Sequence, residues 1–228
     1  MKGRTYVLMT AARNERAHLA LTLDSVRSQT LKPRLWVVVS DGSTDGTDEL
    51  VKSRMREEPY LRLIRVESDQ RPKGFASKVS ALSRAYEQLA SIDHDLIGNL
   101  DADVSFEADY FERLADQFEK NPKLGLAGGF IHEEQDGVFQ SRPTNRSAYV
   151  AGAVQMFRRE CYDAIGGYTP ARYGGEDTIA VIKAALAGWE VQAFPSLVVR
   201  HWKKGSLKRG LISDLFREGA MFQLLGSH

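Results

Sequence analysis

The sequence predicts an α/β protein built around a mostly parallel central sheet. Two observations support this prediction. Over the first 120 residues, short apolar runs typical of buried strands alternate with amphipathic segments typical of helices. The composition is that of a globular protein, with 43% hydrophobic and 27% charged residues, and 228 residues suffice for one large α/β domain.

Four strand–helix pairs make up this alternation. Runs rich in apolar or β-branched residues predict the strands, which cover Tyr6–Met9, Leu35–Val39, Leu61–Val66 and Leu96–Leu100. Apolar residues spaced three or four apart predict the helices, which cover His18–Gln29, a segment capped by Thr44 or Asp45 and running to Met55, Ala76–Leu89, and Phe106–Phe118. Such alternation favours parallel strands with helices on both faces of the sheet.

The pattern changes after Asn121–Pro122, where strands no longer alternate regularly with helices. Four further strands are expected at Leu124–Ile131, Val150–Phe157, Val191–Phe194 and Leu197–Val199. Helices are expected at Glu160–Ile165 and Asp177–Leu186, and an amphipathic one at Ser206–Leu225. The second part of the chain therefore predicts a smaller subregion of different topology.

Charge and cysteine content exclude several classes of protein. A formal net charge of +1 argues against a general nucleic-acid binder. Cys161 is the single cysteine, which rules out a disulfide within the chain and a cysteine-based zinc site and favours a cytoplasmic location. No apolar run approaches the roughly 20 residues that a membrane-spanning helix needs.

Polar residues follow three of the predicted parallel strands. Ala11–Glu15 follow the first strand, Asp41–Gly46 the second, and Asp101–Asp103 the fourth. Ligands of open α/β sheets bind at the carboxyl ends of the strands. We therefore expect these three segments to converge on one site.

The pair Asp101 and Asp103 is the sharpest local feature of the chain. Carboxylates two residues apart, just past a buried strand, can share one divalent cation, and hard oxygen ligands suit Mg²⁺ or Mn²⁺. The alternative is an ordinary Asp-rich turn exposed to solvent. Asp41–Thr47 has a similar alternative, a turn followed by a capped helix.

Taken together, the motifs of this chain resemble those of family 2 glycosyltransferases with a GT-A fold. The matching segments occur in the family's order and span almost the whole chain; they are Asn14–Glu15, Trp36–Thr47, Asn99–Val104, Arg158–Tyr168, Gly174–Asp177 and Arg200–Trp202. The resemblance implies one GT-A domain over residues 1–228, with a nucleotide-binding half at 1–104, an acceptor-binding half at 105–204 and a C-terminal amphipathic helix at 205–228.

The resemblance also implies roles for individual residues. The residues expected to bind the nucleotide part of a nucleoside-diphosphate sugar, such as a UDP- or GDP-sugar, are Ala11, Arg13, Glu15, Asp41, Lys78, Asp101 and Ala102. Asp103 and His201 would bind the metal, and Asp177 would be the general base, with Gly175 and Glu176 on the acceptor side. Two departures from the family pattern leave the base of the nucleotide open: Ser40 replaces the first of two aspartates, and Ala11 and Arg13 replace the commoner Pro and Tyr.

Physical chemistry supports a functional role for each of three residues and also allows each a purely structural role. Lys78 can offset the charge of a leaving diphosphate, or it can simply extend along the surface of its helix. Asp177 can accept the proton of an attacking hydroxyl, or it can stabilise the first turn of its helix. His201, at the end of a strand, is a metal-ligand candidate or a hydrogen-bonded structural histidine. One base and one displacement would invert the anomeric carbon.

The tail from Arg200 to His228 holds six Lys/Arg and two acidic residues. Its amphipathic helix could lie on the inner face of a membrane, near a lipid-linked acceptor, or it could dock on the core. The acceptor itself is expected to be a saccharide, a glycolipid or a polysaccharide.

Two other functions stay open alongside the metal-dependent inverting transferase. One is a sugar nucleotidyltransferase, although the Gly-rich phosphate loop expected after the first strand is missing. The other is a catalytically inactive, nucleotide-sugar-binding subunit of a polysaccharide-assembly complex. The presence of Asp103, Asp177 and His201 favours the active enzyme over the inactive subunit.

Overall fold

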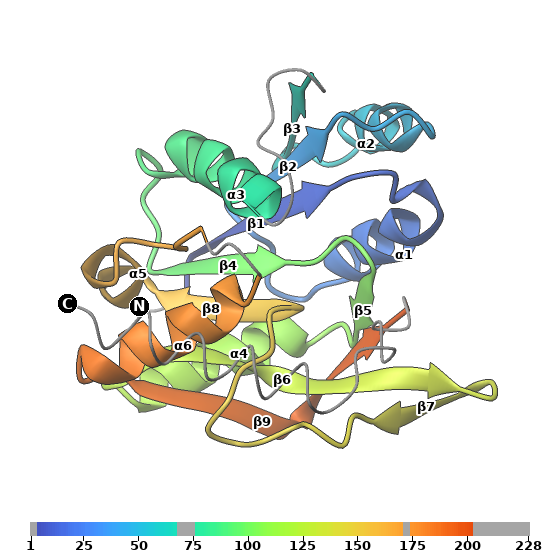
Figure 1. Cartoon of the computed structure of the whole chain (residues 1–228). Helices are drawn as coiled ribbons and strands as arrows, with labels where there is room; N and C mark the ends of the chain where they lie inside the picture. The colour runs from blue at the N-terminus through green and yellow to red at the C-terminus, as the bar shows by residue number, and fades with distance from the viewer. Residues whose placement is uncertain (1–3, 68–75, 171–173, 203–228) are drawn as a thin grey trace.

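The computed structural model describes residues 4–67, 76–170 and 174–202 (Figure 1). The helix expected at Ser206–Leu225 lies outside these ranges. The strands within them are β1 Tyr6–Ala12, β2 Leu35–Asp41, β3 Leu61–Val66, β4 Leu96–Leu100, β5 Val104–Phe106, β6 Leu124–Gln135, β7 Val138–Ser141, β8 Val154–Arg158 and β9 Glu190–His201. The helices are α1 Arg16–Arg27, α2 Thr47–Arg54, α3 Ala76–Leu89, α4 Tyr110–Lys120, α5 Arg159–Ala164 and α6 Glu176–Leu186.

All of these strands belong to one mixed sheet, in the order β3-β2-β1-β4-β8-β6-β9-β5, with β7 paired to β6. β3, β2, β1 and β4 run parallel, as the alternation of strands and helices predicts. β4 is parallel to β1 on one edge and antiparallel to β8 on the other. The change of direction therefore falls at β4, the strand that ends just before Asp101.

Helices cover both faces of the sheet, because successive residues of the buried strands point to opposite sides. Tyr6 and Leu8 of β1 pack in one core with apolar residues of α1, α2 and α4. Val7 and Met9 pack in the other core with residues of α3, α5 and α6. Burial on both faces explains why these strands read as continuous apolar runs rather than as alternating ones.

The sequence prediction was wrong in the region around Phe106. Val104–Phe106 form the short strand β5, and α4 begins only at Tyr110. The cause is tertiary: β5 pairs antiparallel with β9, with Val104 opposite His201. Strand β7 was also missed, and β8 begins at Val154 rather than at Val150.

Two smaller corrections concern turns and strand ends. The segments expected as two strands, Val191–Phe194 and Leu197–Val199, form the single strand β9, whose register against β6 shifts between Gly129 and Phe130. Gly46, in the left-handed region at φ 90°, is the N-cap of α2 in place of Thr44 or Asp45. The Asp45 carboxylate still accepts hydrogen bonds from Thr47 at the start of that helix.

Within the part of the chain that the structure describes, no helix has both the length and the apolar character that crossing a bilayer would require.

Candidate active site

Two cavities lie at the carboxyl ends of the parallel strands. The larger has a volume of about 730 Å³ and is lined by residues that include Asp101, Gly175, Asp177 and His201. The smaller has a volume of about 290 Å³ and is lined by Ala11, Ala12, Arg13, Glu15, Asp41, Ser77, Lys78, Ala81 and Glu176. Lys78 and Glu176 line both cavities, so the two are adjacent. The convergence expected from the strand ends is therefore present.

The smaller cavity brings together five of the residues expected to bind the nucleotide, namely Ala11, Arg13, Glu15, Asp41 and Lys78. The Asp41 carboxylate accepts a hydrogen bond from the hydroxyl of Ser77, which the sequence analysis did not single out. In the sequence, only its position directly before Lys78, at the start of α3, could have pointed to Ser77. Ala102 is 4% exposed and packs in the core, and it is not among the residues that line either cavity.

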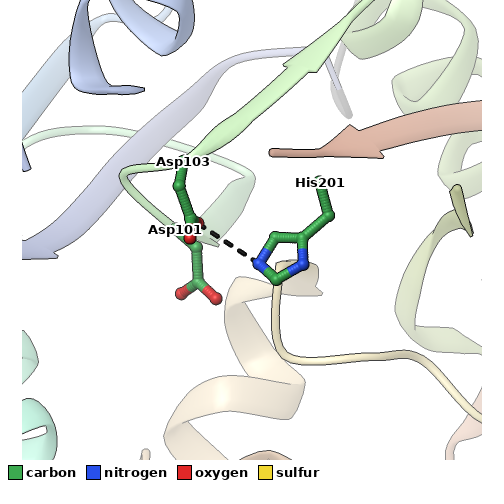
Figure 2. Close-up of side chains that lie close together, drawn as sticks. All are labelled: Asp101, Asp103 and His201. Atoms are coloured by element: carbon green, nitrogen blue, oxygen red, sulfur yellow. Dashed lines mark ion pairs between the residues drawn. The ribbon is translucent and has the colours of Figure 1, made fainter. Parts of the chain in front are cut away.

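Asp101, Asp103 and His201 form a compact cluster (Figure 2). One ligand atom from each residue lies within 4.8 Å of the others. Nε2 of His201 is 3.3 Å from Oδ1 of Asp103. The β5–β9 pairing makes this possible, because it places His201 opposite Val104, the residue after Asp103. The Asp103 carbonyl also accepts a hydrogen bond from the Trp202 N–H at 2.9 Å.

This cluster suits a hard divalent cation, since it offers two carboxylates and one imidazole within reach of a single ion. Burial alone would lower the pKa of His201, but the hydrogen bond and charge of Asp103 raise it above its ordinary value. Without a cation, the positive charge of a protonated His201 partly balances the two carboxylates. A bound cation would take over that balance.

Lys78 lies between two carboxylates, each of which lines the larger cavity. Its Nζ is 2.9 Å from Oδ1 of Asp101 and 3.5 Å from Oε1 of Glu176. Burial by itself would lower the pKa of Lys78, but Asp101 and Glu176 raise it above its ordinary value. The ammonium group is therefore charged at neutral pH. It places one positive charge at the junction of the two cavities.

Asp177 lies in the first turn of α6 and projects into the larger cavity. Gly175, in the left-handed region at φ 91°, is the N-cap of this helix. Oδ2 of Asp177 accepts hydrogen bonds from the Gly152 N–H at 3.0 Å and from the Tyr149 hydroxyl at 3.3 Å. Oδ1 accepts one from the Thr178 N–H at 2.8 Å. These bonds fix the carboxylate, as a proton acceptor in a transfer reaction requires.

Several lining residues of the larger cavity come from the segment between β7 and β8. Arg142, Thr144, Arg146, Tyr149 and Gly152 all line it. This segment lies in the acceptor-binding half expected at 105–204, but its residues could not be singled out from the sequence, because the segment carries no motif of its own. Only the structure shows that it folds back over α6.

Ser40, which stands where the family pattern more often has an aspartate, has a structural role in β2. Its side chain is fully buried, and its hydroxyl bonds to Ser43 at 2.9 Å. Ser43 in turn accepts a hydrogen bond from the Asn14 N–H at 3.1 Å. The chain thus replaces a charge by a short hydroxyl network that ties β2 to the loop after β1.

Solved structures with a similar fold are GT-A glycosyltransferases. The mannosyltransferase PcManGT from Pyrobaculum calidifontis, solved with GDP-Man and Mn²⁺, matches with a TM-score of 0.65 at 22% identity, over 92% of this chain and 59% of that one. GalNAc-T7, solved with UDP, GalNAc and Mn²⁺, matches with a TM-score of 0.68 at 18% identity, over 89% of this chain and 44% of that one. The fold of the present chain is therefore GT-A.

The chain belongs to glycosyl transferase family 2, whose family model matches residues 8–177. Two curated relatives are each 25% identical to it. The succinoglycan biosynthesis protein ExoA of Rhizobium meliloti matches over 91% of this chain and 69% of its own length. The beta-monoglucosyldiacylglycerol synthase of Synechocystis matches over 81% of this chain and 41% of its own length. The chain thus spans only part of the length of each of these relatives.

Proposed function

We propose that this protein transfers a sugar from a nucleoside-diphosphate sugar to the hydroxyl of a saccharide or lipid-linked acceptor, with inversion at the anomeric carbon and with Mg²⁺ or Mn²⁺ as cofactor. One observation carries the proposal. Asp177, with its carboxylate fixed by three donors, shares a cavity with Asp101 and His201 of the acidic cluster, beside a second cavity that suits a nucleoside. An acceptor and the diphosphate end of a donor would meet there.

Each group has a distinct task in this mechanism. Asp41 and Glu15 would accept hydrogen bonds from the nucleoside in the smaller cavity. Asp101, Asp103 and His201 would hold the cation, which when bound neutralises charge on the diphosphate. Lys78 would add a further positive charge beside the diphosphate. Asp177 would take the proton from the acceptor hydroxyl as its oxygen attacks, a contribution typically worth 10²–10⁴-fold in rate.

The acceptor is proposed as a polysaccharide precursor or a glycolipid. The names of the two curated relatives, a succinoglycan biosynthesis protein and a beta-monoglucosyldiacylglycerol synthase, support these two classes. The larger cavity, at about 730 Å³, has room for both a donor sugar and an acceptor sugar. We also propose action on the cytoplasmic face of a membrane, where lipid-linked acceptors are found.

A thermal-shift series tests the binding half of this proposal. UDP, GDP, ADP and CMP are added singly to the pure protein, with and without Mn²⁺ or Mg²⁺. A ligand at about 100 times its dissociation constant stabilises the fold by roughly 2.7 kcal/mol, which raises the melting temperature by several degrees. We expect one nucleoside diphosphate to act only with the metal, and Asp103→Ala to abolish the shift. No shift under any condition would contradict the proposal.

Asp177→Asn separates the active enzyme from a catalytically inactive binding subunit. The variant should keep the thermal shift with nucleotide and metal but lose about 10²–10⁴-fold in turnover, measured as release of nucleoside diphosphate. Asp136→Asn is the matched control, since Asp136 sits in the exposed turn between β6 and β7 and makes the same change of charge. A thermal shift with nucleotide and metal but no turnover in the unsubstituted protein and in Asp136→Asn would favour the inactive subunit. Wild-type turnover in Asp177→Asn would show that Asp177 is not the base.

A further inference from the structure

We propose that Glu133 is a positioning residue that orients the His201 imidazole toward the cation, an inference that rests on the proposed function. β6 and β9 are parallel neighbours, and their register places Glu133 directly beside His201. The imidazole lies between two carboxylates. Its Nε2 is 3.3 Å from Oδ1 of Asp103, and its Nδ1 is 3.9 Å from Oε1 of Glu133.

The environment of Nδ1 points to this role for Glu133. Nδ1 of His201 is buried and has no hydrogen-bond partner among the described residues. A shift of less than about 1 Å would bring it within hydrogen-bond distance of Glu133. An Nδ1–H donated to Glu133 leaves the lone pair of Nε2 facing Asp101 and Asp103, where the cation would bind. Metal-ligating histidines commonly donate their second N–H to a carboxylate in this way.

Glu133 is held in this position by its surroundings. Its side chain is 7% exposed, and a carboxylate so deeply buried must be paired. Arg142 provides the pair: its Nε and Nη2 lie 3.1 and 2.5 Å from Oε1 of Glu133. Arg142 also lines the larger cavity, so the chain Arg142–Glu133–His201 runs from the cavity wall to the cation cluster. Glu133 itself would not contact the cation or the substrates.

Binding of Mn²⁺ alone to the full chain, followed by electron paramagnetic resonance, tests the inference. We expect Glu133→Gln to weaken Mn²⁺ binding by about 10–100-fold, the usual effect of removing such a partner. Glu134→Gln is the matched control, because Glu134 makes the same charge change one residue along β6 and faces the other side of the strand. His201→Gln should weaken Mn²⁺ binding at least as much as Glu133→Gln does.

A second readout follows the imidazole itself. In the Mg²⁺-loaded protein, long-range ¹H–¹⁵N correlation spectra should show the proton of His201 on Nδ1 in the wild type and a mixture of both tautomers in Glu133→Gln. Glu133→Asp covers the case in which Glu133→Gln does not fold, since it keeps a charge for Arg142 but withdraws the carboxylate from His201. It should show an intermediate loss of Mn²⁺ affinity.

The outcomes separate this inference from the proposed function. Wild-type Mn²⁺ affinity in both Glu133 variants, or in His201→Gln, overturns the role of Glu133 and leaves an aspartate-based metal site in place. A wild-type chain that binds no Mn²⁺ overturns the metal dependence of the proposed function and this inference with it. If Glu134→Gln lost as much Mn²⁺ affinity as Glu133→Gln, the loss would come from the change in net charge alone. That outcome would also overturn the inference.

Discussion

The main-chain N–H of Gly152 donates a hydrogen bond to Oδ2 of Asp177 over 3.0 Å. A Cβ atom at position 152 would lie 2.8 Å from that oxygen and 2.9 Å from the Cβ of Asp177. Both distances are shorter than real Cβ contacts. The approach of the two residues therefore depends on the absence of a side chain at Gly152.

Gly152→Ala should displace the Asp177 carboxylate without touching the smaller cavity. A catalytic group misplaced by about 1 Å can cost 10²-fold in rate, so we expect kcat to fall by about that factor. The affinity for donor nucleotide, measured by calorimetry, should stay unchanged. A Gly152→Ala protein with wild-type kcat and an unchanged melting temperature would argue that Asp177 is not the base.

Lys78→Met should weaken nucleotide binding. The variant removes the charge that lies 2.9 Å from Asp101 and leaves Asp101 and Glu176 without this positive partner, which would repel the diphosphate of the proposed donor. A hydrogen bond to a charged group is worth about 1.5–3 kcal/mol, which corresponds to a loss of roughly tenfold or more in affinity. Lys52→Met, on the exposed side of α2, is the control. Equal affinities in the two variants would assign Lys78 a purely structural role.

Trp36→Phe should destabilise the core between β1 and β2. Trp36 is 1% exposed, and its Nε1–H donates to Oγ1 of Thr10 at 2.9 Å. The Thr10 hydroxyl in turn donates a hydrogen bond to the Leu100 carbonyl at 2.7 Å. The smaller ring leaves a cavity and an unsatisfied acceptor, for a loss of about 2–3 kcal/mol in the free energy of unfolding. Urea denaturation measures this loss, and Trp189→Phe, at a partly exposed site, should lose less.

The stability of the fold should depend on His94 between pH 7 and pH 5. Burial lowers the pKa of His94 below its ordinary value of 6.5, although the bond to the Ile92 carbonyl raises it in part. Because the unfolded chain binds the proton more readily, this contribution to stability is complete above pH 6.5 and is lost as the pH falls through the folded pKa.

Melting temperatures over this pH range measure the effect. We expect the wild type to lose stability on acidification and His94→Gln to lose less. His18→Gln, at a partly exposed position on α1, should follow the wild type. A His94→Gln profile parallel to that of the wild type would show that the buried imidazole does not control the acid response.

The first half of the fold could be predicted from the sequence because its signals are local. β3, α3 and β4 have the predicted bounds, since each is a run of one periodicity closed by polar residues. β5 and β7 could not be predicted in this way. Three residues, Val104–Phe106, are too few to show a period, and they form a strand only because β9 lies beside them.

The same distinction holds for the candidate site. Asp41 and Asp101 could be placed because each lies at the carboxyl end of a buried strand, and parallel strands end on one edge. Glu133 and Arg142 could not be placed, since nothing in the sequence indicates that the carboxyl end of β6 meets the carboxyl end of β9. Their relation to His201 depends on the register of two strands separated by more than 50 residues of chain.

The reversal of strand direction at β4 has a consequence for recombining members of this family. β4 carries hydrogen bonds to β1 on one edge and to β8 on the other. A chimera that takes its donor specificity from one parent and its acceptor specificity from another would therefore have to preserve a single ladder, Leu96–Leu100 against Val154–Arg158. A junction placed after Leu100 with this ladder intact keeps the sheet continuous, but each cavity would still combine both parents, since Lys78 and Glu176 line both cavities. A one-residue slip in the ladder would move every side chain of the exchanged strand to the opposite face of the sheet.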